Sequence, residues 1–204
     1  MAHPVRLGIY GGSFDPIHYG HLAIAEEVRA TLNLTQVAFV PAAQQPLKGQ
    51  AQSSADHRLV MVRLACADQP AFIPDDLELR LPPPSYTINT LRAYRHRHGP
   101  AVELWFIIGA DAARDLPRWH RAAELGRLAY LAIVGRPGVK VDLPALTVAL
   151  PTLAGRCLLL EGPQLAVSSS ALRRRLATGA PVRYQLPEAV RLYIAEHGLY
   201  QNHV

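Results

Sequence analysis

Short apolar runs alternate along this 204-residue chain with segments whose apolar residues recur every three or four positions. The runs at residues 5–10, 36–41, 102–108 and 128–134 are nearly continuous in hydrophobic side chains, and 157–160 is a weaker fifth. Unbroken runs of this length predict strands that are buried on both faces. Strands joined by helices pair in parallel, so the alternation predicts a doubly wound α/β fold: a mostly parallel sheet with helices on both faces.

Helical segments complete this plan and extend it toward the C-terminus. Apolar residues keep helical spacing in residues 22–32, 59–66 and 91–94, and further helices are expected at 168–177 and 187–197, each followed by a glycine. We expect a single domain over residues 1–204, with a helical C-terminal segment from about 165 to 204. Ligands of such folds bind at the carboxyl ends of strands, and the long loops 42–54 and 135–144 are candidates for a ligand site.

The charge balance favours anionic ligands. Lys and Arg number 21 against 16 Asp and Glu, a formal charge of +5, which suits phosphorylated metabolites or nucleic acid. The basic residues are scattered along the chain, and it carries no zinc finger, basic zipper or RNA-recognition signature. We therefore expect no nucleic-acid partner.

The chain also lacks the sequence features of membrane and secreted proteins. No apolar stretch approaches the roughly 18 residues of a membrane span, and residues 1–6 lead into a strand pattern without a signal peptide. We expect no membrane contact and a cytoplasmic location. The two cysteines, Cys66 and Cys157, have apolar neighbours and are expected to be buried thiols.

The most informative segment, residues 11–21, reads GGSFDPIHYGH and leads from the first strand into the first helix. Gly11 and Gly12 let the backbone approach a ligand without a Cβ in the way, and a helix N-terminus offers unpaired N–H groups to a phosphate. His18 and His21 are three residues apart and share one face of the helix, and Gly20 leaves room for a bulky ligand. The segment therefore predicts a phosphate site.

Other interpretations of this segment are weaker. A single histidine is more often a satisfied structural residue than a ligand, but here two lie on one face at a glycine-rich turn. A metal site needs a third ligand, and only Asp15 offers itself. The segment lacks the Gly-Lys-Ser/Thr of a Walker A loop and the GxGxxG of a dinucleotide fingerprint.

The string is similar to the signature of the nucleotidylyltransferases that carry an HxGH motif, and the rest of the chain resembles one branch of them, the nicotinate-nucleotide adenylyltransferases. The similar blocks are 46–48 (PLK), 56–61 (DHRLVM), 85–91 (SYTINTL), 106–111 (FIIGAD) with Trp119, 168–173 (SSSALR) and 193–200 (YIAEHGLY). Leu47 stands where the family usually has His, which removes a polar group from a loop near the phosphates. Ser170 replaces Thr and Leu172 replaces Ile, so a hydroxyl and an aliphatic side chain are kept.

This resemblance implies a Rossmann-like enzyme that transfers the adenylyl group of ATP to nicotinate mononucleotide by direct in-line attack, giving deamido-NAD and pyrophosphate in NAD biosynthesis. It implies Mg²⁺ as a cofactor bound through the ATP phosphates, with no ligand from a side chain. The catalytic residues that it implies are His18, His21, Lys48 and Arg173. The implied ATP contacts are Gly11, Gly12, Ser13, Phe14, His18, His21, Gly109, Asp111, Ser169, Ser170 and Arg173. The implied nicotinate mononucleotide contacts are Ser13, Lys48, Tyr86, Thr87 and Trp119.

Alternatives remain for individual residues and for the function. Asp111 is also expected as the N-cap of the following helix, Trp105 as a core residue, and Arg174 and Arg175 as exposed helix residues. The alternative functions are another HxGH enzyme such as a pantetheine-phosphate adenylyltransferase or a cytidylyl enzyme, a non-catalytic nucleotide sensor, and a nucleic-acid binder. We expect a monomer or a small homo-oligomer.

Overall fold

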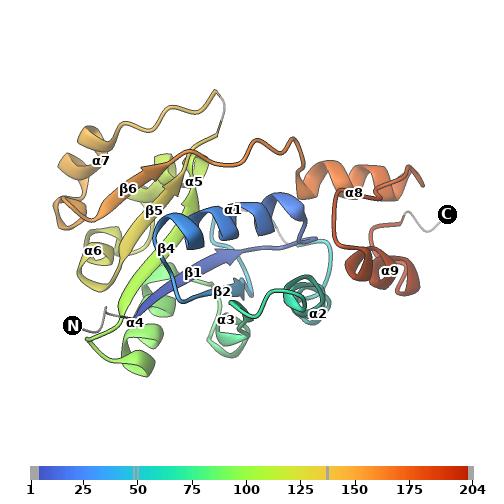
Figure 1. Ribbon diagram of the computed structural model, residues 1–204, viewed down its shortest axis with the longest axis horizontal. Coiled ribbons are helices and arrows are strands. Elements are labelled where there is room, and N and C mark those ends of the chain that lie inside the picture. Colours follow the sequence, from blue (N-terminus) through green and yellow to red (C-terminus); the bar gives the residue numbers. More distant parts are fainter. Residues whose placement is uncertain (1–4, 48, 50, 137, 202–204) are drawn as a thin grey trace.

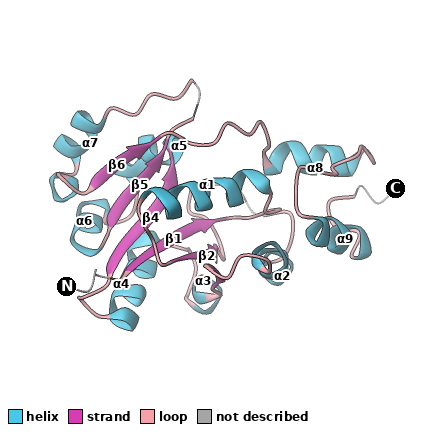
Figure 2. Ribbon diagram, in the orientation of Figure 1, coloured by secondary structure: helices cyan, strands magenta, loops and turns pink. Residues whose placement is uncertain are grey.

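The computed structural model describes residues 5–47, 49, 51–136 and 138–201. Its described residues form a six-stranded sheet in the order β3-β2-β1-β4-β5-β6, in which every neighbouring pair is parallel. The predicted doubly wound α/β fold is therefore confirmed (Figures 1 and 2). The strands are β1 (Arg6–Gly12), β2 (Gln36–Pro41), β3 (Phe72–Pro74), β4 (Glu103–Gly109), β5 (Tyr130–Val134) and β6 (Cys157–Leu160).

Strand β4 lies one residue later than the predicted 102–108, and the strands differ from the prediction in three further places. Strand β1 continues through the glycines, because Gly11 pairs with Val40 and Gly12 with Pro41 of β2. Strand β5 begins at Tyr130 rather than 128, because Leu125–Leu128 form the short helix α6. Strand β3 was not predicted, since its three residues are too few to give an apolar run.

Helices cover both faces of the sheet. The core on one face joins side chains of α1 (Tyr19–Thr31), α2 (Ala55–Cys66), α8 (Ser169–Ala177) and α9 (Glu188–Glu196). The other face packs against α3 (Leu77–Arg80), α4 (Thr87–His98), α5 (Ala110–Asp115), α6 and α7 (Leu143–Ala149). Short 3-10 helices lie at η1 (Leu116–Arg118), η2 (Ala122–Glu124) and η3 (Pro151–Leu153).

Alternation along the strands divides the buried side chains between two cores. In β4, Leu104, Phe106 and Ile108 face one core, whereas Trp105 and Ile107 face the other, as the period of two in a strand requires. Trp105 is buried, stacks on Tyr130 and donates from Nε1 to Glu103 at 2.6 Å. The expectation that Trp105 is a core residue is confirmed.

The strand order reverses between β1 and β4, so the connections that leave these two neighbours run to opposite sides of the sheet. Such a reversal opens a crevice at the carboxyl ends of the two strands. Here that edge carries Gly11 and Gly12 from β1 and Gly109 from β4. Helices α8 and α9 lie side by side beyond the end of β1 (Figure 1).

The two cysteines differ in burial. Burial raises the pKa of the Cys66 thiol to about 12 and that of Cys157 to about 11, but Cys157 is only half-buried because it lies on the edge strand β6. The prediction of a buried thiol is thus confirmed for Cys66 alone.

None of the helices in the described part of the chain is long and apolar enough to cross a membrane.

Helix α8 is anchored by Leu172, which is fully buried in the core that α8 shares with α1, α2 and α9, whereas Leu192 on α9 is 53% exposed. We expect Leu172→Ala to lower the free energy of unfolding by about 2–5 kcal/mol through the lost contacts and the cavity left behind. The matched variant Leu192→Ala should change it by less than about 0.5 kcal/mol. Urea unfolding of both variants checks this, and equal losses would contradict the placement of α8.

Candidate active site

Helix α1 begins in the crevice between β1 and β4, at the end of the loop that follows Gly12. Its N-cap is His18, and the third helical residue is His21. The two imidazole rings stack with centroids 3.8 Å apart, and the backbone N–H of His18 donates to Nδ1 of His21 at 3.3 Å. The prediction that the two histidines share one face is confirmed.

Gly20 serves the histidine pair itself. A Cβ on Gly20 would lie 3.0 Å from the ring of His18. The space beside Gly20 is therefore bounded by the His18 ring, and room for a ligand there stays a prediction. Glycine favours the stacked position of the imidazole, because the ring would have to shift to admit a larger residue.

The buried ring of Phe14 packs against His21. Its φ is +47°, its side chain is 2% exposed, and its ring meets the ring of His21 edge-on with centroids 5.2 Å apart. A Cβ on Gly12 would lie 3.1 Å from the same phenyl ring. Because the ring of Phe14 is in the core, only its backbone is available to a ligand at this edge. The ring contributes to the site by packing against His21.

Burial sets the charge of His18. The side chain is 5% exposed, and desolvation lowers its pKa to about 4. His18 is therefore neutral at pH 7 and donates one ring hydrogen rather than two. Its Nδ1 atom is buried without a hydrogen-bond partner among the described residues.

The first turn of α8 reaches the same loop from the far end of the sequence. Ser168 caps the helix by accepting from the N–H of Ala171 at 3.2 Å. Ser169 Oγ donates to the carbonyl of Pro16 at 2.9 Å, and Arg173 Nη1 donates to the carbonyl of Asp15 at 2.6 Å. The structure thus brings Ser169 and Arg173 to the histidine loop.

The remaining polar residues of α8, Ser170, Arg174 and Arg175, are exposed. Arg173 Nη2 donates to the exposed Ser170 at 3.5 Å. Arg174 is exposed, and Arg175 donates to the carbonyl of Pro181 at 2.9 and 2.7 Å from Nε and Nη2. The expectation that Arg174 and Arg175 are exposed helix residues is confirmed.

Asp15 is buried at the centre of the loop and accepts hydrogen bonds from the backbone and from hydroxyl groups. It was the one candidate for a third metal ligand. No group of three or more His, Cys, Asp or Glu side chains lies together in the described residues. The role of Asp15 in this structure is therefore to hold protein donors.

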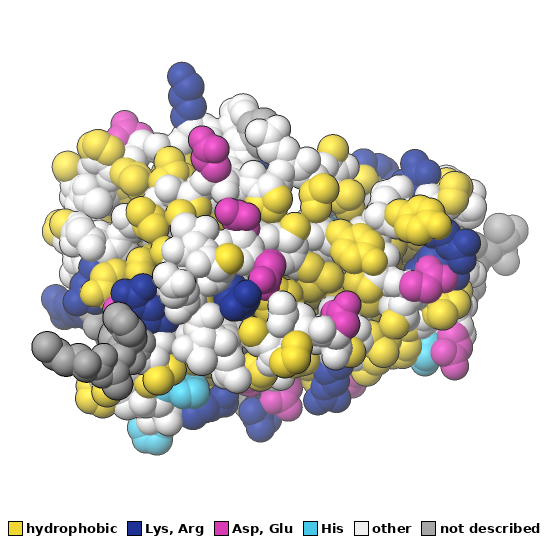
Figure 3. Space-filling model, in the orientation of Figure 1, with side chains coloured by type: hydrophobic (Ala, Val, Ile, Leu, Met, Phe, Trp, Pro, Cys, Tyr) yellow, Lys and Arg dark blue, Asp and Glu magenta, His cyan; other side chains and the backbone are white. Residues whose placement is uncertain are grey.

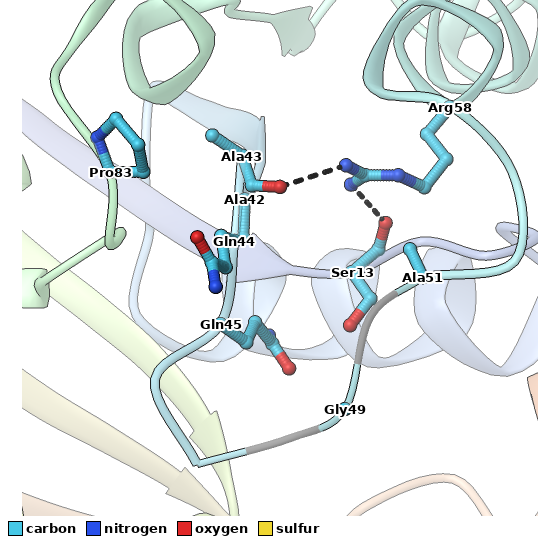
Figure 4. A pocket seen from close by; sticks show the side chains of 9 residues that line it. All are labelled: Ser13, Ala42, Ala43, Gln44, Gln45, Gly49, Ala51, Arg58 and Pro83. Atoms are coloured by element: carbon cyan, nitrogen blue, oxygen red, sulfur yellow. Dashed lines mark hydrogen bonds between the residues drawn. The ribbon is translucent and has the colours of Figure 1, made fainter.

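A cavity of about 250 Å³ opens beside the loop (Figure 4). Arg58 from α2 lies in its wall, 2% exposed, and donates to the carbonyls of Ser13 at 2.8 Å and Ala43 at 3.4 Å. Burial lowers the pKa of Arg58, and the negative charge of Asp15 partly offsets this shift by raising the pKa. The cavity is lined by Ser13, Ala42, Ala43, Gln44, Gln45, Gly49, Ala51, Arg58 and Pro83.

The loop after β2 is held on its other side by Ser85. Ser85 Oγ accepts from the N–H of Ala43 at 2.9 Å, and the N–H of Ser85 donates to the carbonyl of Gln44 at 2.8 Å. Leu47 is 53% exposed in this loop. The predicted catalytic residue Lys48 lies outside the described residues, between Leu47 and the cavity-lining Gly49.

The residues expected at the nicotinate ring gather where α4 begins. Tyr86 is the N-cap of α4 and Thr87 its first residue, and the ring of Tyr86 lies 4.3 Å from that of His120. Trp119, next to His120 in the chain, is half-buried with its ring edge-on to Phe106 at 6.3 Å. His120 was not predicted at this position, because it belongs to no recognised motif.

Asp111 lies at the carboxyl end of β4, as predicted, but it is not the N-cap. Gly109 caps α5, and Asp111 is its second residue. The Asp111 carboxylate instead pairs with Arg114 at 3.3 Å and Arg136 at 3.1 Å, both exposed. The N-cap expectation was wrong because the helix begins two residues earlier, directly from the strand.

A scan against family models matches the cytidylyltransferase-like family over residues 9–175. A protein of Roseiflexus sp. (strain RS-1), named "Probable nicotinate-nucleotide adenylyltransferase", is 52% identical over 96% of this chain and 98% of its own. A protein of the same name from Herpetosiphon aurantiacus is 50% identical, with the same coverage. The chain belongs to the nicotinate-nucleotide adenylyltransferase family.

Solved structures agree with the fold of this family. The nicotinic acid mononucleotide adenylyltransferase of Plasmodium falciparum complexed with NaAD has a TM-score of 0.79 to this chain at 22% identity, and covers 96% of this chain and 97% of its own. A second structure of that protein, complexed with APC, has a TM-score of 0.76. This chain therefore has the fold that its adenylyltransferase family leads us to expect.

The buried neutral His18 makes the stability of this adenylyltransferase depend on pH. The unfolded chain binds a proton near the ordinary pKa of 6.5, whereas folded His18 binds it only near 4, so the free energy of unfolding falls as pH drops through this window. We expect the His18 contribution to be about 2 kcal/mol smaller at pH 5 than at pH 7.5.

Urea unfolding at the two pH values measures this contribution as the difference between the wild type and His18→Gln. The exposed His96 gives the control variant His96→Gln, which should keep the pH dependence of the wild type. An unchanged pH dependence in His18→Gln would contradict a depressed pKa.

Proposed function

We propose that this chain transfers the adenylyl group of ATP to nicotinate mononucleotide and releases deamido-NAD and pyrophosphate. The observation that carries the proposal is the stacked His18–His21 pair at the start of α1, tied to Arg173 of α8, in a chain about half identical to relatives of that name. The pair lies at the reversal of strand order, where ligands of this fold bind.

The reaction needs positioning and charge stabilisation, because no side chain forms a bond. A phosphate oxygen of nicotinate mononucleotide attacks the α-phosphorus of ATP, and the bond from that phosphorus to the bridging oxygen of the β-phosphate breaks. The bridging oxygen keeps the electron pair and leaves with pyrophosphate. Fixed N–H donors that face the developing charge are worth far more in such a site than in water.

The donors follow from the geometry of the loop. Because the His18 N–H donates to Nδ1 of His21, the neutral His21 ring carries its proton on Nε2. We assign this Nε2–H and the neutral ring of His18 to the phosphate oxygens of ATP. Arg173 and Lys48 supply positive charge as pyrophosphate forms.

The remaining contacts with ATP belong to the same proposal. The backbone of Gly11, Gly12 and Phe14 and the N-terminus of α1 face the phosphates, as P-loop-like helix starts do. Gly109 and Asp111 receive the adenosine ribose at the end of β4. Ser169 and Ser170 hold the phosphates from α8.

The nicotinate mononucleotide contacts lie on the other side of the crevice. Ser13 and Lys48 hold the acceptor phosphate, and Trp119 stacks on the pyridine ring. The backbone N–H groups of Tyr86 and Thr87 receive the nicotinate carboxylate. An amide would turn its own N–H donors toward these donors, so the acid is preferred.

Mg²⁺ is part of the proposal as the companion of ATP. The two histidines offer ring N–H donors and Arg173 adds a positive charge, so they suit phosphate oxygens, and the ion would be held by those oxygens and water. When bound, it neutralises charge on the phosphates.

ATP as the donor also leads us to infer a cytoplasmic location. A monomer or small homo-oligomer stays a prediction.

The alternative functions have less support. Lys and Arg side chains are scattered over the face seen in Figure 3 rather than gathered in one stripe, which disfavours a nucleic-acid binder. The paired histidines with Arg173 disfavour a sensor without catalysis. Another HxGH enzyme remains the closest competitor, and the choice of acceptor distinguishes it.

Pyrophosphate release with ATP and Mg²⁺ tests the function directly. We expect rapid release with nicotinate mononucleotide, slow release with nicotinamide mononucleotide and none with phosphopantetheine, because only the acid matches the N–H donors of Tyr86 and Thr87. Release with phosphopantetheine alone would keep the histidine chemistry and refute the assignment of Tyr86, Thr87 and Trp119. No release with any of them would favour the sensor.

Removal of one charge-stabilising donor should cost much of the rate. We expect His21→Ala to lower kcat roughly 10²–10³-fold, the range for loss of one preorganised donor. The exposed His96 on α4 gives the control His96→Ala, which should keep the wild-type rate. A loss of less than about tenfold in folded His21→Ala would contradict the assignment, because it falls well below that range.

A further inference from the structure

The carboxylate of Asp15 joins segments from both ends of the chain. Oδ2 accepts from the N–H of Gln52 at 2.8 Å. Oδ1 accepts from the N–H and the hydroxyl of Ser53 at 3.3 and 2.5 Å, and from the hydroxyl of Tyr200 at 2.7 Å. Asp15 is 3% exposed, so these bonds replace the water that the charged group has lost.

Tyr200 is placed to complete this cluster. It follows α9, has φ +65°, and its ring packs against the core shared by α1, α2, α8 and α9. Its hydroxyl also lies 3.0 Å from Ser53 Oγ. Burial, and next the charge of Asp15, raise the pKa of Tyr200 above its usual range, so the phenol stays protonated as a donor.

The cluster connects the two loops that form the proposed site. Asp15 belongs to the histidine loop, and its carbonyl accepts from Arg173. Gln52 and Ser53 end the loop 42–54, which carries Lys48 and faces the cavity through Gln44, Gln45, Gly49 and Ala51. Tyr200 therefore fixes the end of one loop against the start of the other.

We propose that Tyr200, acting through Asp15 and Ser53, is a positioning residue that holds Gln52 and Ser53, at the end of the loop 42–54, in the arrangement that the site needs to bind nicotinate mononucleotide. This inference rests on the proposed function of the site. Without the phenol hydroxyl, Gln52 and Ser53 leave this arrangement for part of the time, and the apparent affinity for the acceptor falls with the fraction of molecules that keep it. Saturating acceptor restores the arrangement, so KM rises while kcat is kept.

Tyr193 provides a matched control on α9. Its hydroxyl lies 2.8 Å from Nδ1 of His57 on α2, and it makes no hydrogen bond to either loop among the residues that the structure describes. Each variant, Tyr200→Phe and Tyr193→Phe, removes one hydroxyl that joins the C-terminal segment to the rest of the chain. A role in stability alone would affect both variants alike.

Steady-state kinetics of the full chain with ATP, Mg²⁺ and nicotinate mononucleotide give the first test. We expect Tyr200→Phe to raise the KM for nicotinate mononucleotide roughly tenfold and to keep kcat within about twofold, since one hydrogen bond to a charged group is lost. Tyr193→Phe should keep both constants. A lower kcat at unchanged KM is what partial unfolding gives, and this result, or equal constants in the two variants, would overturn the proposal.

Hydrogen exchange without substrate gives a second test that does not depend on activity. The amides of Gln52 and Ser53 donate to Asp15, so we expect them to exchange faster in Tyr200→Phe than in the wild type or in Tyr193→Phe. Unchanged exchange at these amides would overturn the proposal. If the wild type releases no pyrophosphate with any acceptor, the proposed function fails, and the exchange result alone decides whether Tyr200 holds the loop.

Ser53→Ala adds a double-mutant cycle. Because Ser53 and Tyr200 bond to the same oxygen of Asp15 and lie next to each other, their effects on KM should be non-additive. We expect Ser53→Ala with Tyr200→Phe to raise KM by less than the product of the two single effects. Full additivity would contradict a shared mechanism.

Discussion

The parallel pairing of β1 with β4 at the point where the strand order reverses is the constraint on which the site depends. Right-handed crossovers carry the chain from these neighbours to opposite sides of the sheet, so a crevice is left at their carboxyl ends. Both strands end there in glycine, which lets a ligand approach the backbone. The helix that starts from β1 presents the histidine pair, and the one that starts from β4 presents Asp111.

Buried charged groups then determine how the loops around this crevice lie. Asp15 and Arg58 are buried and Arg173 is partly buried, and each of these charges would be costly to bury without partners. Their hydrogen bonds go mainly to backbone groups: Arg58 to Ser13 and Ala43, Arg173 to Asp15, and Asp15 to Gln52 and Ser53. Bonds to backbone fix the path of a loop, so the same interactions that satisfy these charges also shape the site.

The alternation of apolar runs was enough to predict the sheet, its parallel pairing and the strands of its centre, because buried parallel strands need continuous hydrophobic side chains. It could not predict β3, whose three residues obtain their strand conformation from pairing with β2. Among the site residues, the histidine pair and Arg173 followed from motifs. Arg58 lay inside a recognised block but without a role, since a buried arginine gives no periodic signal. Tyr200 also lay inside a recognised block without a role, and Ser53 carried no signal, because they meet Asp15 across 185 and 38 residues.

The sequence by itself determined the alternation of the long strands with helices, the glycine-rich turn, and the chemistry of a phosphate site with two histidines on one helical face. These properties are local: each depends on side chains within a few residues of one another, where spacing decides which face they share. Only the tertiary structure decided that the histidines stack, that burial keeps His18 neutral, and that Tyr200 reaches the loop of Asp15. Stacking, desolvation and contacts between distant segments arise when the chain closes on itself, and no local pattern encodes them.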